Sequence, residues 1–66
     1  MNVSTLLKTF AFETKLLLVD VRRNKTYSIY RKQYFNEYVT EWDGEVVISR
    51  VTNGKIAVFY KSGIGL

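Results

Sequence analysis

The residues best suited to bind a ligand lie between positions 22 and 32, where the chain reads RRNKTYSIYRK. This segment holds five basic residues and no acidic one, and aromatic side chains are interleaved with the bases. Basic side chains contact phosphates and tyrosine rings stack on nucleobases, so the pattern is typical of a surface that binds single-stranded nucleic acid. The candidate anion-contacting residues are Arg22, Arg23, Lys25, Tyr30 and Lys32.

The following segment, 33–45, reverses the charge with four acidic residues and no base. The whole chain still has a formal net charge of +4, which is compatible with a nucleic-acid partner and is also common on solvated surfaces. The aromatic residues of this segment are of the types enriched at protein interfaces. They give the candidate protein-contacting residues Tyr34, Tyr38 and Trp42.

Catalytic chemistry has little support in the composition. The sequence has no histidine for general acid–base work and no cysteine nucleophile, which also excludes disulfides and the common zinc sites. The glycine-containing end, 61–65, lacks the preceding glycine and the following helix of a phosphate-binding loop. We therefore expect no enzymatic activity, no cofactor and no metal site.

A length of 66 residues corresponds to a single domain, 1–66, with a small core. A hydrophobic content of 47% is enough for a packed interior, but without disulfides or a metal so short a domain often needs self-association for stability. We therefore expect a homo-oligomer. The longest apolar run, Leu16 to Val19, is far shorter than the roughly 20 residues of a membrane-spanning helix. We expect no membrane contact, and the absence of cysteine fits a cytoplasmic location.

The strongest local signal is Asn53-Gly54, since both residues tolerate the positive φ that a two-residue hairpin turn requires. One face of the resulting hairpin is expected to join the core. The other face, which includes Ile48 and Phe59, is half apolar, so it is either covered by another layer or used at an interface. The predicted register pairs Val51 with Ile56, Ser49 with Val58, and Val47 with Tyr60.

Asp43-Gly44 gives a second turn signal, which predicts that residues 33–42 form a strand paired with the segment after it. The same residues have an alternative as a helix, because four apolar residues follow the spacing i, i+3, i+4, i+7. These are Phe35, Tyr38, Val39 and Trp42. The aromatic and β-branched content favours the strand, and the helix is kept as the alternative.

A further hairpin is expected over 15–32, with a three-residue loop, 23–25, that pairs Val19 with Ile29. Ser4 is the expected cap of a short helix over 4–10. The prediction is therefore a mainly β fold, with a short N-terminal helix and about five antiparallel strands in a small curled sheet or barrel. The alternative is an α+β fold with a helix at 33–42.

A few residues resemble the Sm-like RNA chaperones, which combine a short helix with a five-stranded sheet. The resemblance rests on Trp42-Asp43 before one strand and on the run 60–64, YKSGI, where the bacterial family has Tyr-Lys-His-Ala-Ile. Ser62 stands in place of the histidine, and the family's glycine in the second strand is missing. The resemblance implies ring-forming oligomers, and the predictions of fold and function do not rest on it.

Two functions are consistent with these observations. The first is a small non-catalytic protein-binding module, such as an inhibitor, adaptor or assembly subunit, that acts through an exposed sheet edge and its aromatic residues. Its short, cysteine-free composition associates it with phages or mobile elements. The alternative is a nucleic-acid-binding β-domain, in which the basic–aromatic hairpin 22–32 contacts phosphates and stacks on bases.

Overall fold

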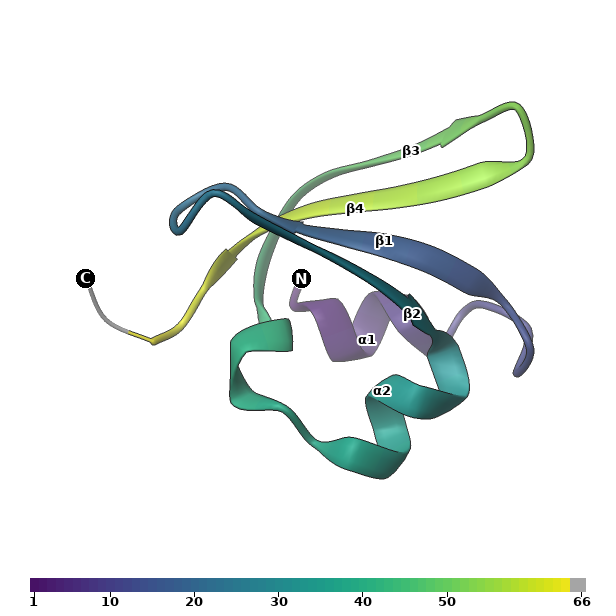
Figure 1. The fold of residues 1–66 in the computed structure, drawn as a ribbon, viewed down its shortest axis with the longest axis horizontal. Helices are drawn as coiled ribbons and strands as arrows, with labels where there is room; N and C mark the ends of the chain where they lie inside the picture. The colour runs from purple at the N-terminus through teal and green to yellow at the C-terminus, as the bar shows by residue number, and fades with distance from the viewer. Residues whose placement is uncertain (65–66) are drawn as a thin grey trace.

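The computed structural model describes residues 1–64, in which two helices pack on one face of a four-stranded sheet (Figure 1). The strand order is β2-β1-β4-β3, with β1 parallel to β4 and the two outer pairs antiparallel. A mainly β fold with a short N-terminal helix is thus confirmed, but the sheet is mixed and open, with four strands. The elements in chain order are α1 (Val3–Leu7), β1 (Lys15–Asp20), β2 (Lys25–Tyr30), α2 (Arg31–Glu37), the 3-10 helix η1 (Thr40–Trp42), β3 (Gly44–Thr52) and β4 (Lys55–Ser62).

The predicted strand at 33–42 is replaced by α2 and η1, in line with the alternative prediction. Helix α2 has no side-chain cap at its start, so its own sequence gives it little stability. Tertiary packing holds it instead. The Tyr34 ring stacks on Trp42 at 6.3 Å between centroids, and the Arg31 guanidinium lies 4.9 Å from the centroid of Phe35.

The hairpin predicted at Asp43-Gly44 does not form, because Gly44 is the first residue of β3. A Cβ atom at this position would lie 2.0 Å from the carbonyl oxygen of Lys61. The glycine is therefore required for the close approach of β3 to β4, and the same residue type had suggested a turn.

The β1–β2 hairpin forms with a different register from the one predicted. Its turn spans residues 21–24, and Leu16, not Val19, lies opposite Ile29. The side chain of Asp20 fixes the longer turn, because Oδ1 accepts the backbone N–H groups of Arg22 at 3.0 Å and Arg23 at 3.3 Å. The shift places Val19 on the opposite face of the sheet from Ile29, with which it was predicted to pair.

The turn at Asn53-Gly54 is confirmed, with φ angles of 52° and 74°. The predicted pairs of Val51 with Ile56 and Ser49 with Val58 are present, but Val47 does not pair with Tyr60. A β-bulge between Val46 and Ile48 shifts the register, so that Val46 faces Tyr60 and Val47 is left 55% exposed.

The core lies between the helices and the covered face of the sheet. Leu18, Val58 and Tyr60 are fully buried at its centre, and the Tyr60 hydroxyl donates to the carbonyl oxygen of Glu41 in η1. The predicted N-terminal helix is present, but its cap is Asn2, whose Oδ1 accepts the backbone N–H of Thr5 at 2.9 Å. Within residues 1–64, no helix has the length and apolar character needed to cross a membrane.

Candidate docking surface on the open sheet face

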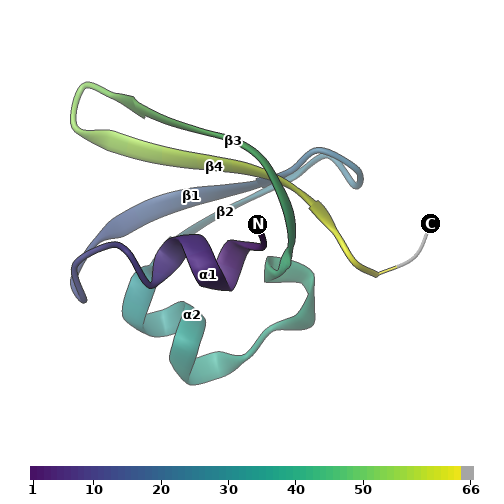
Figure 2. The same ribbon diagram turned by 180° about the vertical axis from the view of Figure 1, so that it is seen from behind.

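The sheet has one face that no helix of the described chain covers. Figures 1 and 2 show α1 and α2 together on the opposite side. Because side chains alternate along a strand, every second residue of each strand points to this uncovered side. We call it the open face, and its residues are Lys15, Leu17 and Val19 of β1, Thr26, Ser28 and Tyr30 of β2, Glu45, Ile48, Arg50 and Thr52 of β3, and Lys55, Ala57, Phe59 and Lys61 of β4.

The register divides the open face into rows that differ in chemistry. The row at the start of β1 holds Lys15 and Lys55 on neighbouring strands, since the residues that follow them, Leu16 and Ile56, are paired. Arg50 lies in the next row, opposite Ala57. We call these three bases, Lys15, Lys55 and Arg50, the basic end of the open face.

The row farther along β1 is apolar. Val19 lies opposite Phe59, and Phe59 lies opposite Ile48 on the next strand. Val19 and Phe59 are half-buried by their neighbours in the sheet, and Ile48 is 48% exposed. We call these three residues the apolar end. Leu17 and Ala57, also half-buried, join it to the basic end.

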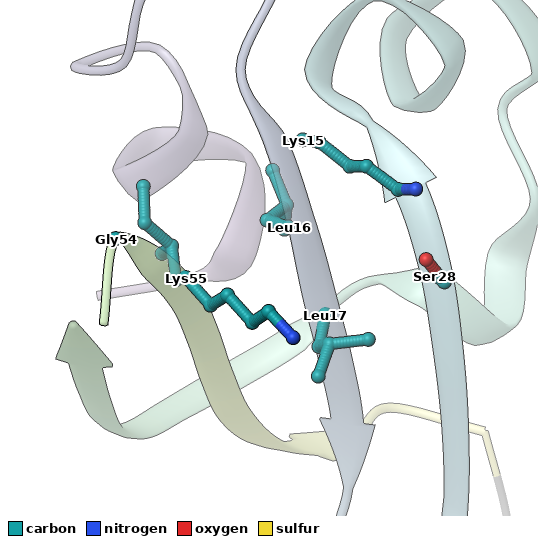
Figure 3. Close-up of a pocket in the computed structure, with 7 residues that line it drawn as sticks. Lys15, Leu16, Leu17, Ser28, Gly54 and Lys55 are labelled. Carbon is teal, nitrogen blue, oxygen red and sulfur yellow. The ribbon is translucent and has the colours of Figure 1, made fainter. Parts of the chain in front are cut away.

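Two shallow grooves flank Lys55 at the basic end. One, of about 320 Å³, is lined by Lys15, Leu17, Ser28 and Lys55 among others (Figure 3). The other, of about 340 Å³, is lined by Arg50, Leu17 and Lys55 among others. In Figure 3 the ammonium of Lys55 approaches Leu17 and that of Lys15 reaches toward β2. An apolar floor under lysine side chains can hold a group that combines a carboxylate or phosphate with a hydrocarbon part.

The edge of the sheet at β3 is only partly covered. The backbone N–H of Val46 donates to the carbonyl oxygen of Met1 at 2.9 Å, and Asn2 forms an isolated bridge with Glu45, so the N-terminus pairs with the beginning of β3. Val51, farther along the strand, is 71% exposed. The edge from Val47 to Thr52 therefore remains accessible to another strand.

The predicted anion-contacting residues do not form one site. The Arg22 guanidinium donates to the carbonyl oxygen of Ser62 at 3.2 Å, and Arg23 is half-buried with its Nη1 atom inaccessible. Lys25 is exposed beside the turn. Tyr30 is the last residue of β2, about 17 Å from Lys25 at the usual rise per strand residue, and Lys32 follows it in α2. The turn thus offers fewer available cations than its sequence indicates.

The predicted protein-contacting residues are divided between core and surface. Tyr34 and Trp42 are each only 6% exposed and pack on each other, so neither is part of the accessible surface. Tyr38 is 83% exposed, beside a groove on the helical side. It ends α2 in a left-handed conformation with φ 51°. Of the three, the structure leaves Tyr38 alone available to a partner.

Asp20 is the one fully buried carboxylate among residues 1–64, and its surroundings indicate a structural role. Burial raises the pKa of Asp20, but the nearby Ser62 hydroxyl and the backbone N–H groups around the carboxylate outweigh it, so the net pKa lies below the ordinary 3.8. A carboxylate held ionised in this way suits a turn cap and not a general acid. The described residues also contain no cluster of three or more groups that could hold a metal ion.

The chain has no match among protein-family models, curated proteins or solved structures. The resemblance to Sm-like RNA chaperones therefore gains no support, and the open mixed sheet with a parallel pair is not the all-antiparallel arrangement that had been expected.

Several open-face residues were absent from the sequence-based candidates. Leu17 and Val19 were expected to lie on the same face as Ile29, and Lys15 and Lys55 had no predicted relation to each other. The sequence did indicate part of the open face, because the second face of the hairpin at 53–54, which includes Ile48 and Phe59, is half apolar. The parallel pairing of β1 with β4 extends that face across the whole sheet.

Proposed function

We propose that this protein is a non-catalytic binding module that docks another protein on the open face of its sheet. The observation that carries the proposal is the uncovered apolar end, Val19, Phe59 and Ile48, next to a basic end. An apolar centre with a polar, charged border is the usual composition of a protein interface. The proposal includes an inhibitor, adaptor or assembly subunit acting in the cytoplasm, and it extends the predicted sheet-edge surface to the neighbouring face.

The proposal can be tested by selecting ligands from a random peptide library displayed on phage, with the immobilised protein as bait. A Phe59→Ser variant should lose binding of the selected peptides, because the centre of the docking surface becomes polar. A Tyr38→Ser variant is the matched control, since Tyr38 is an exposed aromatic residue outside the open face. Circular dichroism verifies that both variants fold. Peptides that bind Phe59→Ser as well as they bind the wild type would contradict the proposal.

Nucleic-acid binding remains a second candidate, favoured by the combination of bases with Tyr30 and Phe59 on the same face. The test is fluorescence anisotropy with single-stranded DNA and RNA at two salt concentrations. The protein-docking proposal expects no binding at micromolar protein and low salt. Binding with a steep salt dependence that is lost in an Arg50→Ala, Lys55→Ala double variant would favour nucleic acid instead.

We also propose that the protein self-associates through β3, in keeping with the expected homo-oligomer. Face-to-face pairing of two open faces would bring the lysines of the two basic ends together, which is unfavourable, whereas pairing of two β3 edges joins the exposed Val51 side chains. Light scattering should show a mass above 7.7 kDa at high concentration, and Val51→Lys should return it to the monomer value. A wild type that stays monomeric throughout would contradict this proposal.

A further inference from the structure

The open face is predominantly basic. The open face carries four bases, and Glu45 is the one acidic residue on the strands that points to it, beside Lys61 in the register. The other carboxylates lie elsewhere: Asp20 is buried, Glu13 precedes β1, and Glu37, Glu41 and Asp43 belong to the segment of α2 and η1. On the strands, Lys15 and Lys55 therefore occupy the row of the open face that is farthest from Glu45.

The basic end and the apolar end lie one after the other along the strand direction. A ligand running parallel to β1 would meet Lys15 and Lys55 first, then Leu17, and finally Val19 and Phe59. Lys15 is held in place by Tyr30, whose ring centroid lies 5.7 Å from its ammonium nitrogen. Along β1, the open face is thus positively charged at the start of the strand and apolar toward its end.

From this order we infer that the partner docks through a segment with carboxylates at one end and apolar side chains at the other. Its Asp or Glu residues contact the ammonium groups of Lys15 and Lys55, and its apolar side chains cover Leu17, Val19 and Phe59. The inference rests on the proposed docking function and names the chemistry of the partner. Charge complementarity of this kind fixes the direction in which a segment lies and rejects basic competitors.

Uncharged and basic segments fit the same surface less well. Binding of an apolar segment alone would leave the ammonium groups beside hydrocarbon without a counter-charge, which removes part of their hydration at no electrostatic gain. A nucleic-acid strand would place phosphates near the lysines but polar sugars and phosphates over Val19 and Ile48. An acidic, apolar peptide segment satisfies both ends of the open face.

The test uses the displayed random library and the folded full chain. Peptides selected on the wild type should be enriched in Asp and Glu beside apolar residues. A synthetic peptide from that pool should bind the Lys15→Glu, Lys55→Glu double variant roughly tenfold more weakly. It should also bind the wild type more weakly as salt rises. The matched control is Lys8→Glu with Lys32→Glu, which makes the same charge change at exposed positions outside the sheet and should leave affinity within about twofold.

The outcomes separate this inference from the proposed function. Selected peptides that lose binding in Phe59→Ser, yet lack acidic residues and bind the Lys15→Glu, Lys55→Glu variant normally, would overturn the acidic partner and leave the docking face intact. Peptides that are insensitive to Phe59→Ser would overturn both. If Lys15→Glu, Lys55→Glu fails to fold, Lys15→Gln with Lys55→Gln replaces it, with the same direction of change and a smaller loss. Competition of the peptide by single-stranded DNA at the same lysines, with no acidic enrichment, would also overturn the inference.

Discussion

Val19 and Phe59 lie opposite each other in the parallel central strands, on the face that no helix of residues 1–64 covers. Leu18 and Val58 precede them on the same strands, point to the other face and are fully buried. The two neighbouring pairs are thus both apolar, but one lies in the core and the other on the open face. This contrast allows the exposure of the open face to be measured without knowing the partner.

The substitution of valine by threonine at the two sites should have different costs. Val58→Thr buries a hydroxyl in the core and should lower the free energy of unfolding by about 1–3 kcal/mol. Val19→Thr leaves its hydroxyl in reach of water and should cost no more than about 0.5 kcal/mol. Urea unfolding followed by the fluorescence of buried Trp42 measures both. Equal losses would mean that another copy or segment covers the open face in solution.

Two glycines near the end of β4 should differ sharply in their tolerance of alanine. Gly44→Ala places a Cβ atom 2.0 Å from the carbonyl oxygen of Lys61, so the β3 backbone must move and about 3 kcal/mol or more of stability should be lost. Gly63 has no heavy atom within 4 Å of its hypothetical Cβ, and Gly63→Ala should be neutral within about 0.5 kcal/mol. Thermal unfolding of the pair provides the measurement. A stable Gly44→Ala variant would show that β3 and β4 are farther apart than described.

The carboxylate of Asp20 should make stability dependent on acidic pH. Its pKa in the folded state is below 3.8, so its contribution is present above pH 3.8 and is lost as pH falls through the folded-state pKa. Asp20→Asn should therefore cost roughly 1–2 kcal/mol near neutral pH and progressively less below pH 3.8. Urea titrations across this range give the curve, with the exposed Glu13→Gln as control. A cost that stays constant with pH would rule out a role for the charge.

Two buried tyrosines should make the fold sensitive to alkali. Burial is the main cause that raises the pKa of Tyr60 and of Tyr34 above 10.0, and the charges of Asp20 and Asp43 add to it. Because the folded-state pKa is raised, their contribution is complete below pH 10 and declines as pH rises above it. Ultraviolet absorbance should show phenolate appearing together with unfolding.

A phenylalanine variant tests the alkaline effect. Tyr60→Phe leaves the Glu41 carbonyl without its hydroxyl donor, so it should lower stability near neutral pH by about 1–3 kcal/mol. The same variant should reduce the further decline above pH 10. Tyr38→Phe, at an exposed site, serves as the comparison and should change neither quantity. An unchanged alkaline decline in Tyr60→Phe would assign the effect to other groups.

The sequence predicted structure correctly where adjacent residues determine the backbone conformation. Asn53-Gly54 requires positive φ at two successive positions, and the turn formed with the predicted pairs next to it. The predicted pairing of the strands was wrong where a turn or a strand contains more residues than expected. Asp20 accepts backbone N–H groups and extends the first turn to four residues, and the bulge after Val46 shifts the second ladder. Neither effect has a distinctive pattern in a single sequence.

The open face depends on relations that are distant along the chain. Its two central strands, β1 and β4, are about 40 residues apart, and a parallel pair has no connecting turn to reveal it. The helix over 31–37 likewise depends on stacking of Tyr34 with Trp42 and not on a capping residue. The chemistry of the candidate surface was therefore present in the sequence, but its grouping into a basic end and an apolar end was not.

Of the four strands in residues 1–64, β4 is the last in the sequence, yet it occupies the middle of the sheet between β1 and β3. Without it, the β1–β2 hairpin and β3 have no backbone contact with each other, and the core loses Val58 and Tyr60. Nascent chains that stop before residue 55 should therefore remain unfolded and accessible to proteases. We expect residues 1–64 to fold in a single step once β4 has emerged from the ribosome and the side chains of Val58 and Tyr60 can reach Leu18 and η1.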